Sequence, residues 1–70
     1  MTYTVIIAIG DGEYIRKSFY NNDLYKAREW ARTECKKIGG RWAQVVDKYN
    51  EIFFYLDPEG QLHDYSDINR

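Results

Sequence analysis

The chain has little of what small proteins commonly use to reinforce their fold. Its 70 residues include one cysteine and one histidine, so neither an internal disulfide nor an ordinary zinc cluster can form. The longest apolar run near the start, residues 4–9, is far shorter than the roughly 20 residues of a membrane span. The net charge of −1 indicates neither a nucleic-acid binder nor a DNA mimic. We therefore expect a cytoplasmic domain with no cofactor, metal or membrane contact, its single thiol fitting a reducing compartment.

Aromatic residues are what the chain has in abundance, with seven Tyr, three Phe and two Trp. A chain of this size buries only about 60% of its unfolded surface, so its stability margin is thin. Each aromatic side chain can bury roughly 150–250 Å². The aromatic residues are thus the expected source of core stability, and a homodimer is the other available supplement.

The first twenty residues predict a β-hairpin. Residues 3–9 read YTVIIAI, a β-branched run typical of a central strand. Gly10-Asp11-Gly12 supplies the turn. Residues 13–20 alternate, with Ile15 and Phe19 on one face, as expected of a strand half exposed to water.

A helix is expected next, followed by more strands. Asn21-Asn22-Asp23 favours a helix start through side-chain capping, and Gly39-Gly40 favours its end. Between them, apolar residues recur at spacings of three and four, which places them on one stripe of a helix. They are Leu24, Ala27, Ala31, Cys35 and Ile38.

The remaining sequence predicts strands over residues 41–47 and 51–56, a type I turn over residues 57–60, and a short fifth strand over residues 62–65. The order is ββαββ with that additional strand, so the fold class is α+β: a single helix packed on an antiparallel sheet. Residues 1–65 form one domain, and residues 66–70 are expected to be a frayed tail.

The residues that could carry catalysis have simpler structural interpretations. Cys35 lies on the apolar stripe, where a free cysteine usually behaves as a small buried hydrophobe. His63, beside Asp64, follows a surface turn and is expected to be a solvated loop histidine. Gly10-Asp11-Gly12 is too short for a phosphate-binding loop. We therefore predict that the protein is not an enzyme.

The helix flanks supply the first candidate binding surface. A basic row follows one side of the apolar stripe and includes Tyr25, Arg28 and Arg32. Trp30 lies on the other side, offset by about 100° from the stripe. Trp30 is either core-edge packing beneath lysine stems or an exposed anchor for a partner, since Trp, Tyr and Arg dominate interface hot spots.

The far face of the sheet supplies the second candidate surface. Strand side chains alternate between faces, so the strand aromatics cannot all point to the helix. An uncovered aromatic face indicates contact with a protein, a second copy or single-stranded bases. The alternative is a small cluster that steadies a thin domain. The candidates on this face are Tyr14, Tyr20, Trp42 and Tyr55.

Two binding functions remain after these considerations. The first is engagement of a protein partner, because a 70-residue chain is too small for a usual ligand cavity. The alternative is nucleic-acid binding through the basic helix row and exposed aromatics. Residues 23–38 carry a net +2 and residues 57–70 a net −3. The acidic tail counts against the alternative.

A resemblance adds to this interpretation. Residues 18–31 read SFYNNDLYKAREWA, residues 39–47 read GGRWAQVVD, and residues 52–55 read IFFY. This succession resembles the architecture of small phage-encoded anti-CRISPR and other anti-defence proteins. The resemblance implies a non-enzymatic inhibitor that binds a bacterial host complex. It carries over no functional residues, and the mildly basic helix does not match inhibitors that imitate DNA by acidity.

Overall fold

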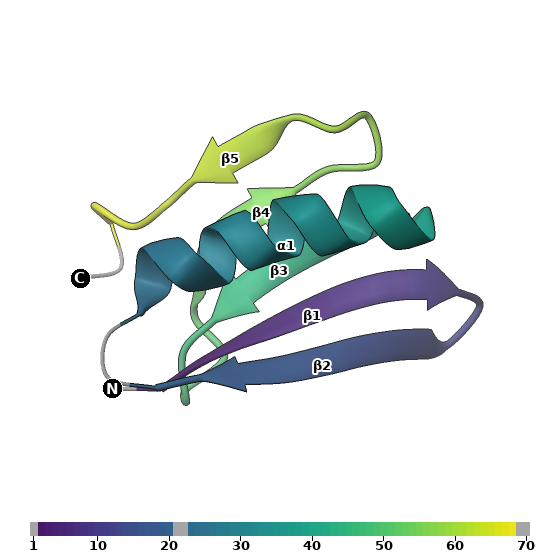
Figure 1. Cartoon of the computed structure of the whole chain (residues 1–70). Helices are drawn as coiled ribbons and strands as arrows, with labels where there is room; N and C mark the ends of the chain where they lie inside the picture. The colour runs from purple at the N-terminus through teal and green to yellow at the C-terminus, as the bar shows by residue number, and fades with distance from the viewer. Residues whose placement is uncertain (1, 21–22, 69–70) are drawn as a thin grey trace.

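The computed structural model describes residues 2–20 and 23–68 as one helix and a five-stranded antiparallel sheet (Figure 1). The strand order in the sheet is β2-β1-β3-β4-β5. The elements are β1 (Tyr3–Gly10), β2 (Glu13–Phe19), α1 (Leu24–Ile38), β3 (Trp42–Val46), β4 (Ile52–Leu56) and β5 (Leu62–Asp64).

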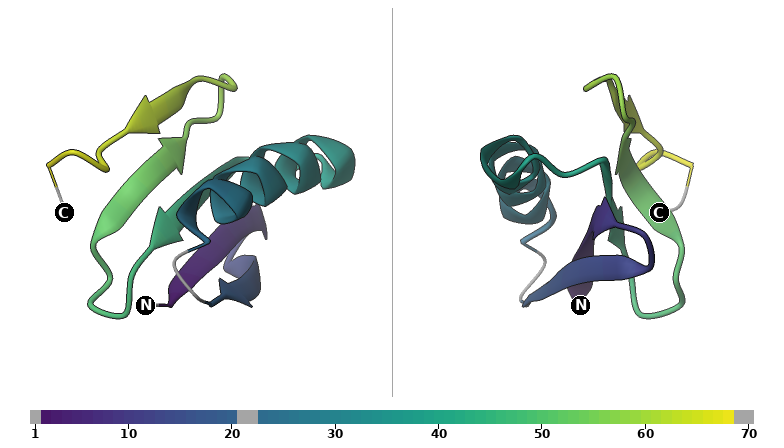
Figure 2. Two further views of the ribbon diagram at one scale, coloured as in Figure 1. Left: turned by 60° about the vertical axis from the view of Figure 1, so that its left-hand side comes forward. Right: turned by 90° about the vertical axis from the view of Figure 1, so that its right-hand side faces the viewer.

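The predicted α+β class and the short fifth strand are confirmed. The helix covers one face of the sheet, and no other element of the described chain lies on the opposite face (Figure 2). We call the uncovered side the open face. Strand β3 is antiparallel to β1, as β2 is, so β2 and β3 run in the same direction. Parallel strands require a long crossover connection, and α1 provides it.

Alternation along the strands decides which side chains meet the helix. The register places Val5 opposite Val45, and Ile7 opposite Ala43. These four side chains are at most 1% exposed and lie in the core beneath α1. Full burial of a Val or Ile side chain stabilises the fold by roughly 1.5–3 kcal/mol. The central pair of strands, β1 and β3, thus forms the floor of the core.

The helix meets this floor with small side chains. Ala27, Ala31 and Cys35 are buried. At the two ends of the same stripe, Leu24 is partly buried and Ile38 is 37% exposed. The predicted stripe is therefore correct, with its centre at the three smallest residues, which let the helix axis lie close to the sheet. No helix among the described residues is long and apolar enough to cross a membrane.

The start of α1 differs from the expected capping. Asp23 precedes the helix with φ −80° and ψ 50°, and its side chain makes no capping hydrogen bond to a described residue. An N-cap side chain usually reaches the free amides from a more extended backbone. Here the Asp23 carbonyl accepts the Ala27 N–H at 3.0 Å, and the Asp23 N–H donates to the Tyr20 carbonyl at 3.3 Å. Asn21 and Asn22 lie outside the described residues.

The end of α1 is a glycine pair, as predicted. Gly39 adopts the left-handed conformation at φ 68°. The Gly40 N–H donates to the Cys35 carbonyl at 2.7 Å, and the Gly39 N–H donates to the Lys36 carbonyl at 3.4 Å. This is the pattern of a Schellman motif, which satisfies the last carbonyls of a helix. The chain then turns directly into β3.

Two turns of the same kind flank β4. In the turn before β4, the Asp47 carboxylate accepts the N–H groups of Tyr49 and Glu51 at 2.8 and 3.0 Å. Asn50 completes this turn with a positive φ of 65°. Asx side chains commonly hold turns in this way.

The turn after β4 repeats the arrangement one strand later. The Gly60 N–H donates to the Asp57 carbonyl at 2.9 Å, and Glu59 does not have the positive φ of a type II turn, so the predicted type I turn is confirmed. The Asp57 carboxylate accepts the N–H groups of Glu59 and Gln61 at 2.9 and 2.8 Å. Both hairpins around β4 are therefore fixed by a five-residue turn that begins with aspartate.

The segment after β5 differs from the expected frayed tail. Ser66 is 4% exposed, and its hydroxyl donates to the Asp64 carboxylate at 2.6 Å. The Tyr65 N–H donates to the Phe53 carbonyl, and the Ile68 N–H donates to the Tyr65 carbonyl. These bonds fold residues 65–68 into a turn against β4. Residues 69 and 70 lie outside the described part of the chain.

We expect Gly40→Ala to destabilise the protein by about 1–3 kcal/mol, the usual cost of overpacking. A Cβ at this position would lie 2.7 Å from Ile7 Cγ2 and 2.8 Å from Cys35 Sγ, where the helix end approaches β1. Gly10→Ala is the matched control, because its Cβ would meet no atom within 4 Å. Chemical denaturation measures both free energies of unfolding. Equal stability of the two variants would show that the helix end can move away from the sheet.

Candidate functional site

Aromatic rings cross the open face of the sheet in a continuous series. They come from β2, β3, β4, β5 and the turn after β5, and we call them the aromatic row: Tyr14, Trp42, Tyr55, His63 and Tyr65. Successive ring centroids are 5.9, 6.2, 5.9 and 6.5 Å apart. Aromatic pairs at such distances are worth about 0.5–1.5 kcal/mol each beyond their buried area. The row is thus held in place by its own contacts.

Strand register explains why the row is continuous. Tyr14 and Trp42 both pair with Ala8, which lies between them on the central strand β1. Because alanine is small, the two large rings meet above it, and Ala8 is only 2% exposed. Tyr55 and His63 are direct cross-strand partners. Trp42 reaches Tyr55 diagonally, which long side chains can do on one sheet face.

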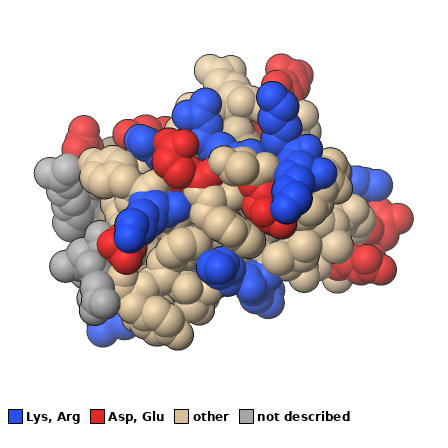
Figure 3. Space-filling model, in the orientation of Figure 1, with Lys and Arg blue, Asp and Glu red and all other residues tan. Residues whose placement is uncertain are grey.

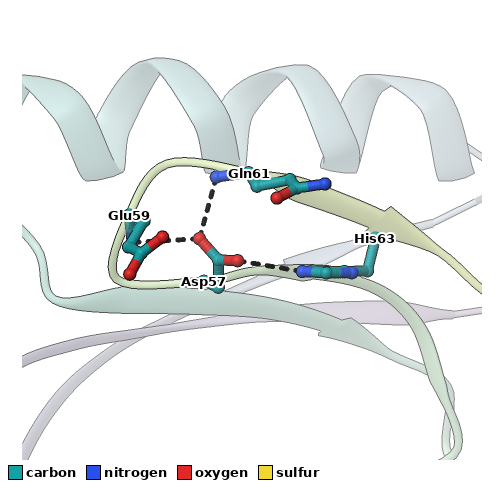
Figure 4. Close-up of polar contacts among 4 residues, drawn as sticks. All are labelled: Asp57, Glu59, Gln61 and His63. Carbon is teal, nitrogen blue, oxygen red and sulfur yellow. Dashed lines mark hydrogen bonds and ion pairs between the residues drawn. The ribbon is translucent and has the colours of Figure 1, made fainter.

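His63 is anchored by the turn that precedes β5 (Figure 4). Its Nε2 lies 2.9 Å from Asp57 Oδ2, and since an ionised carboxylate only accepts, the imidazole donates this hydrogen bond. The other oxygen of Asp57 accepts the two backbone N–H groups of the turn. The His63 bond is the main cause that lowers the pKa of the Asp57 carboxyl, and the N–H groups of Gln61 and Glu59 add to it. One carboxylate therefore holds both the turn and a ring of the row.

The sheet-face candidates from the sequence are partly brought together. Tyr14, Trp42 and Tyr55 lie in the aromatic row, with Tyr14 48% exposed. Tyr20 lies apart from them, because it follows the end of β2 and is exposed in the connection to α1. Phe53 lies in the core, where its ring is 5.4 Å from that of Tyr3.

The helix candidates do not form one surface. Tyr25 and Arg28 lie on the side of α1 that faces β4. The Tyr25 ring is 6.3 Å from Phe54, and the Arg28 guanidinium lies 5.1 Å from the Tyr25 ring and 5.6 Å from the Phe54 ring. Arg28 also donates to the neighbouring Glu29 carboxylate at 3.0 Å. These side chains thus extend the core to its edge.

Trp30 lies on the opposite side of α1, above β2. Its ring is 6.0 Å from Phe19, and the Lys17 ammonium lies 5.3 Å from the Trp30 ring. Trp30 is partly buried against the core, which is the packing expected of a core-edge residue. The lysine that covers it comes from β2 rather than from the helix. An anchor role for Trp30 stays a prediction.

A groove of about 700 Å³ lies between the C-terminal half of α1 and the β4–β5 turn. Arg32 lines this groove together with Lys36 and Arg41, and Glu29, Asp57 and Glu59 line it too. Its walls therefore carry both signs of charge. Cys35 also borders it, but the side chain is buried and desolvation raises the pKa of the thiol. The described residues contain no group of three or more potential metal ligands.

Sequence reasoning missed His63, Asp57 and Tyr65 as members of one site. His63 is a strand residue that is 35% exposed, not the solvated loop residue that we expected. The signal was present in the turn. An Asp-x-x-Gly-x turn pairs residue 57 with residue 61, and continuing that register pairs residue 55 with residue 63. The turn type therefore places His63 beside Tyr55.

No family model, curated protein or solved structure matches this chain.

We expect the free energy of unfolding to decrease as the pH falls below about 4, the ordinary range of an Asp carboxyl. The pKa of Asp57 is lowered in the folded state, so its stabilising effect is present above the ordinary pKa and is lost as the pH falls through the lower folded value. Asp57→Asn should therefore reduce the acid dependence, measured by denaturation at about pH 2–7.

Asp47→Asn is the matched control, because Asp47 holds an equivalent turn that has no histidine attached. The acid dependence that Asp57→Asn removes should exceed that removed by Asp47→Asn. If Asp57→Asn and the unmodified protein lose stability in parallel on acidification, the Asp57–His63 bond does not act in the way described.

Proposed function

We propose that this chain is a small non-enzymatic protein that binds a protein partner through the aromatic row. The observation that carries the proposal is the position of the row: five rings from four strands and a turn lie together on the one sheet face that no described helix covers. Tyr and Trp are the residues most enriched in binding hot spots. Large aromatic areas left on an uncovered face are typical of interaction sites.

The arrangement of reactive side chains supports a binding role rather than catalysis. Cys35 lies beneath the helix, whereas His63 lies on the open face, so the sheet separates the thiol from the imidazole. Nucleophilic catalysis needs a nucleophile and a base within hydrogen-bond reach. His63 is instead bonded to Asp57, which also holds the turn.

The distribution of charge favours a protein over a nucleic acid. Arg16 lies beside the row, with its guanidinium 5.8 Å from the Tyr14 ring. Other cations are engaged elsewhere: Lys17 lies over rings on the helix side, and Arg41 pairs with Asp11. On the helix side, Lys and Arg are interspersed with Asp and Glu (Figure 3). A nucleic-acid site would need a continuous cationic surface along the phosphates.

The same proposal includes inhibition of a host complex as the biological outcome. It rests on the resemblance to small phage-encoded anti-defence proteins, together with the separation of the thiol from the imidazole. An inhibitor of this kind occupies a surface of its target and needs no cavity of its own. An aromatic face with a small footprint fits that requirement.

We expect Tyr14→Ala to weaken partner binding by about 2 kcal/mol or more while leaving the fold intact, because Tyr14 is an exposed member of the row. The measurement is a tagged pull-down from bacterial lysate, with and without nuclease, followed by titration of the retained protein. Tyr49→Ala is the matched control. Tyr49 is 74% exposed in the β3–β4 turn and belongs to no part of the row.

Retention of one protein despite nuclease, lost in Tyr14→Ala and kept in Tyr49→Ala, would support the proposal. Retention that depends on nucleic acid, together with a gel shift at low salt, would move the assignment to the nucleic-acid alternative. Equal binding by both variants would place the interface away from the aromatic row.

A further inference from the structure

We propose that the open face binds a second copy of this chain, forming a symmetric dimer in which the two aromatic rows lie face to face. This inference rests on the proposed function, since it names the partner of the same surface. It predicts a weak dimer that depends on protein concentration.

Apolar side chains lie beside the aromatic row on the open face, which is the first argument for a covering layer. The strand register places Ile6, Ala8, Val46 and Ile52 on the open face together with the row. Thr4 and Gln44 lie on the same face, with Gln44 between Ile6 and Tyr55. Where one face of a sheet is in contact with water, the strand sequences usually alternate so that polar side chains lie on that face. Ala8 is buried beneath the rings of Tyr14 and Trp42, whereas Val46 is 3% exposed and Ile6 and Ile52 are half-buried although no described helix covers them. Aliphatic and aromatic side chains on the outer side of a sheet are typical of a face that packs on a second layer.

The ends of the open face carry complementary charge. Arg16 lies on the outermost strand β2, and none of the described carboxylates pairs with it. At the opposite end, the Asp57 carboxylate reaches the open face through its bond to His63, and Asp57 is 20% exposed. The face is thus positive at the β2 end and negative at the β4–β5 end.

Two-fold symmetry converts this polarity into mutual attraction. A two-fold axis that lies in the interface close to the strand direction, between β1 and β3, places β2 of one copy over β4 of its partner. Arg16 then faces the end that contains Tyr55, Asp57 and His63 of the partner copy, and the same contact occurs twice. Arginine suits this position because it both pairs with carboxylates and stacks on aromatic rings. Along the axis, β1 of one copy lies over β3 of its partner, so Ala8 meets Trp42 and Ile6 meets Gln44, and each contact occurs twice, as an isologous interface requires.

The size of the face sets the expected strength. The two longest dimensions of the fold are 29 and 20 Å, so coverage of four of the five strands buries a projected area of roughly 500 Å² per copy. The total of about 1,000 Å² is at the lower limit of specific protein interfaces. We therefore expect a dissociation constant in the micromolar range, which corresponds to a binding free energy of about −8 kcal/mol.

The test is sedimentation equilibrium of the complete chain from about 1 to 500 µM, a range that brackets the expected dissociation constant. The paired variants are Arg16→Glu, which places like charges at both contacts with Asp57, and His63→Arg, which places like charges opposite Arg16. Each variant alone should dimerise at least about tenfold more weakly than the unmodified protein.

An equimolar mixture of the two variants should recover dimerisation. The carboxylate introduced at position 16 of one copy then faces the guanidinium introduced at position 63 of the other, while the second contact stays as in the unmodified dimer. Arg32→Glu is the matched control on the helix side, and it should leave the dimer unaffected.

Circular dichroism shows whether the variants fold. If Arg16→Glu does not, Arg16→Gln, which removes the attraction without repulsion, should still weaken the dimer several-fold. A monomer at all concentrations, or a dimer that neither variant affects, would overturn the inference. A monomer that nevertheless retains a lysate protein through Tyr14 would overturn the second copy as partner and leave the proposed function standing.

Discussion

The contact between three small helix residues and the two central strands is the constraint on which the rest of the structure depends. Ala27, Ala31 and Cys35 bring α1 close to the sheet, and Gly40 permits the same closeness where the helix ends. The described chain has only this one helix, and the helix covers one face of the sheet, so no described helix is left to cover the other face. An aromatic strand residue whose side chain points away from α1 can therefore pack only against other side chains of the open face. The aromatic row is the result.

The elements of the fold follow from local patterns that tertiary packing reinforces. The β-branched run, the alternating strand and the spacing of the helix stripe each predicted an element within two residues of its observed bounds. These patterns predict the elements correctly because the apolar residues that are buried recur with the same period as the backbone of the helix or strand. Likewise, the split of strand aromatics between two faces required only alternation. It placed Tyr14, Trp42 and Tyr55 on the open face, where the structure joins them.

The features that sequence reasoning missed depend on contacts between distant residues or on exact turn geometry. His63 belongs to the row because the Asp57 turn fixes the register of β5, and one residue of slip would move it to the other face. Asp23 resembles a cap, yet its backbone angles direct the side chain elsewhere. Trp30 rests on Phe19 under a lysine from another strand, which the helix sequence alone cannot indicate. Ser66 is held by a hydrogen bond to Asp64, two residues earlier, so a polar sequence near the end of the chain did not indicate that Ser66 would be buried.

The two aspartate turns around β4 also affect how the chain entropy of folding is distributed. Strands β3, β4 and β5 form a meander in which pairing Val46 with Ile52 closes about six residues. Pairing Ala8 with Trp42 closes about 34 residues, because the chain must traverse β2 and α1 first. The difference in loop-closure entropy is about 1.5 kcal/mol. The molecule is thus two locally closed pieces, a hairpin and a meander, and the β1–β3 junction under the helix bears the entropic cost of joining them.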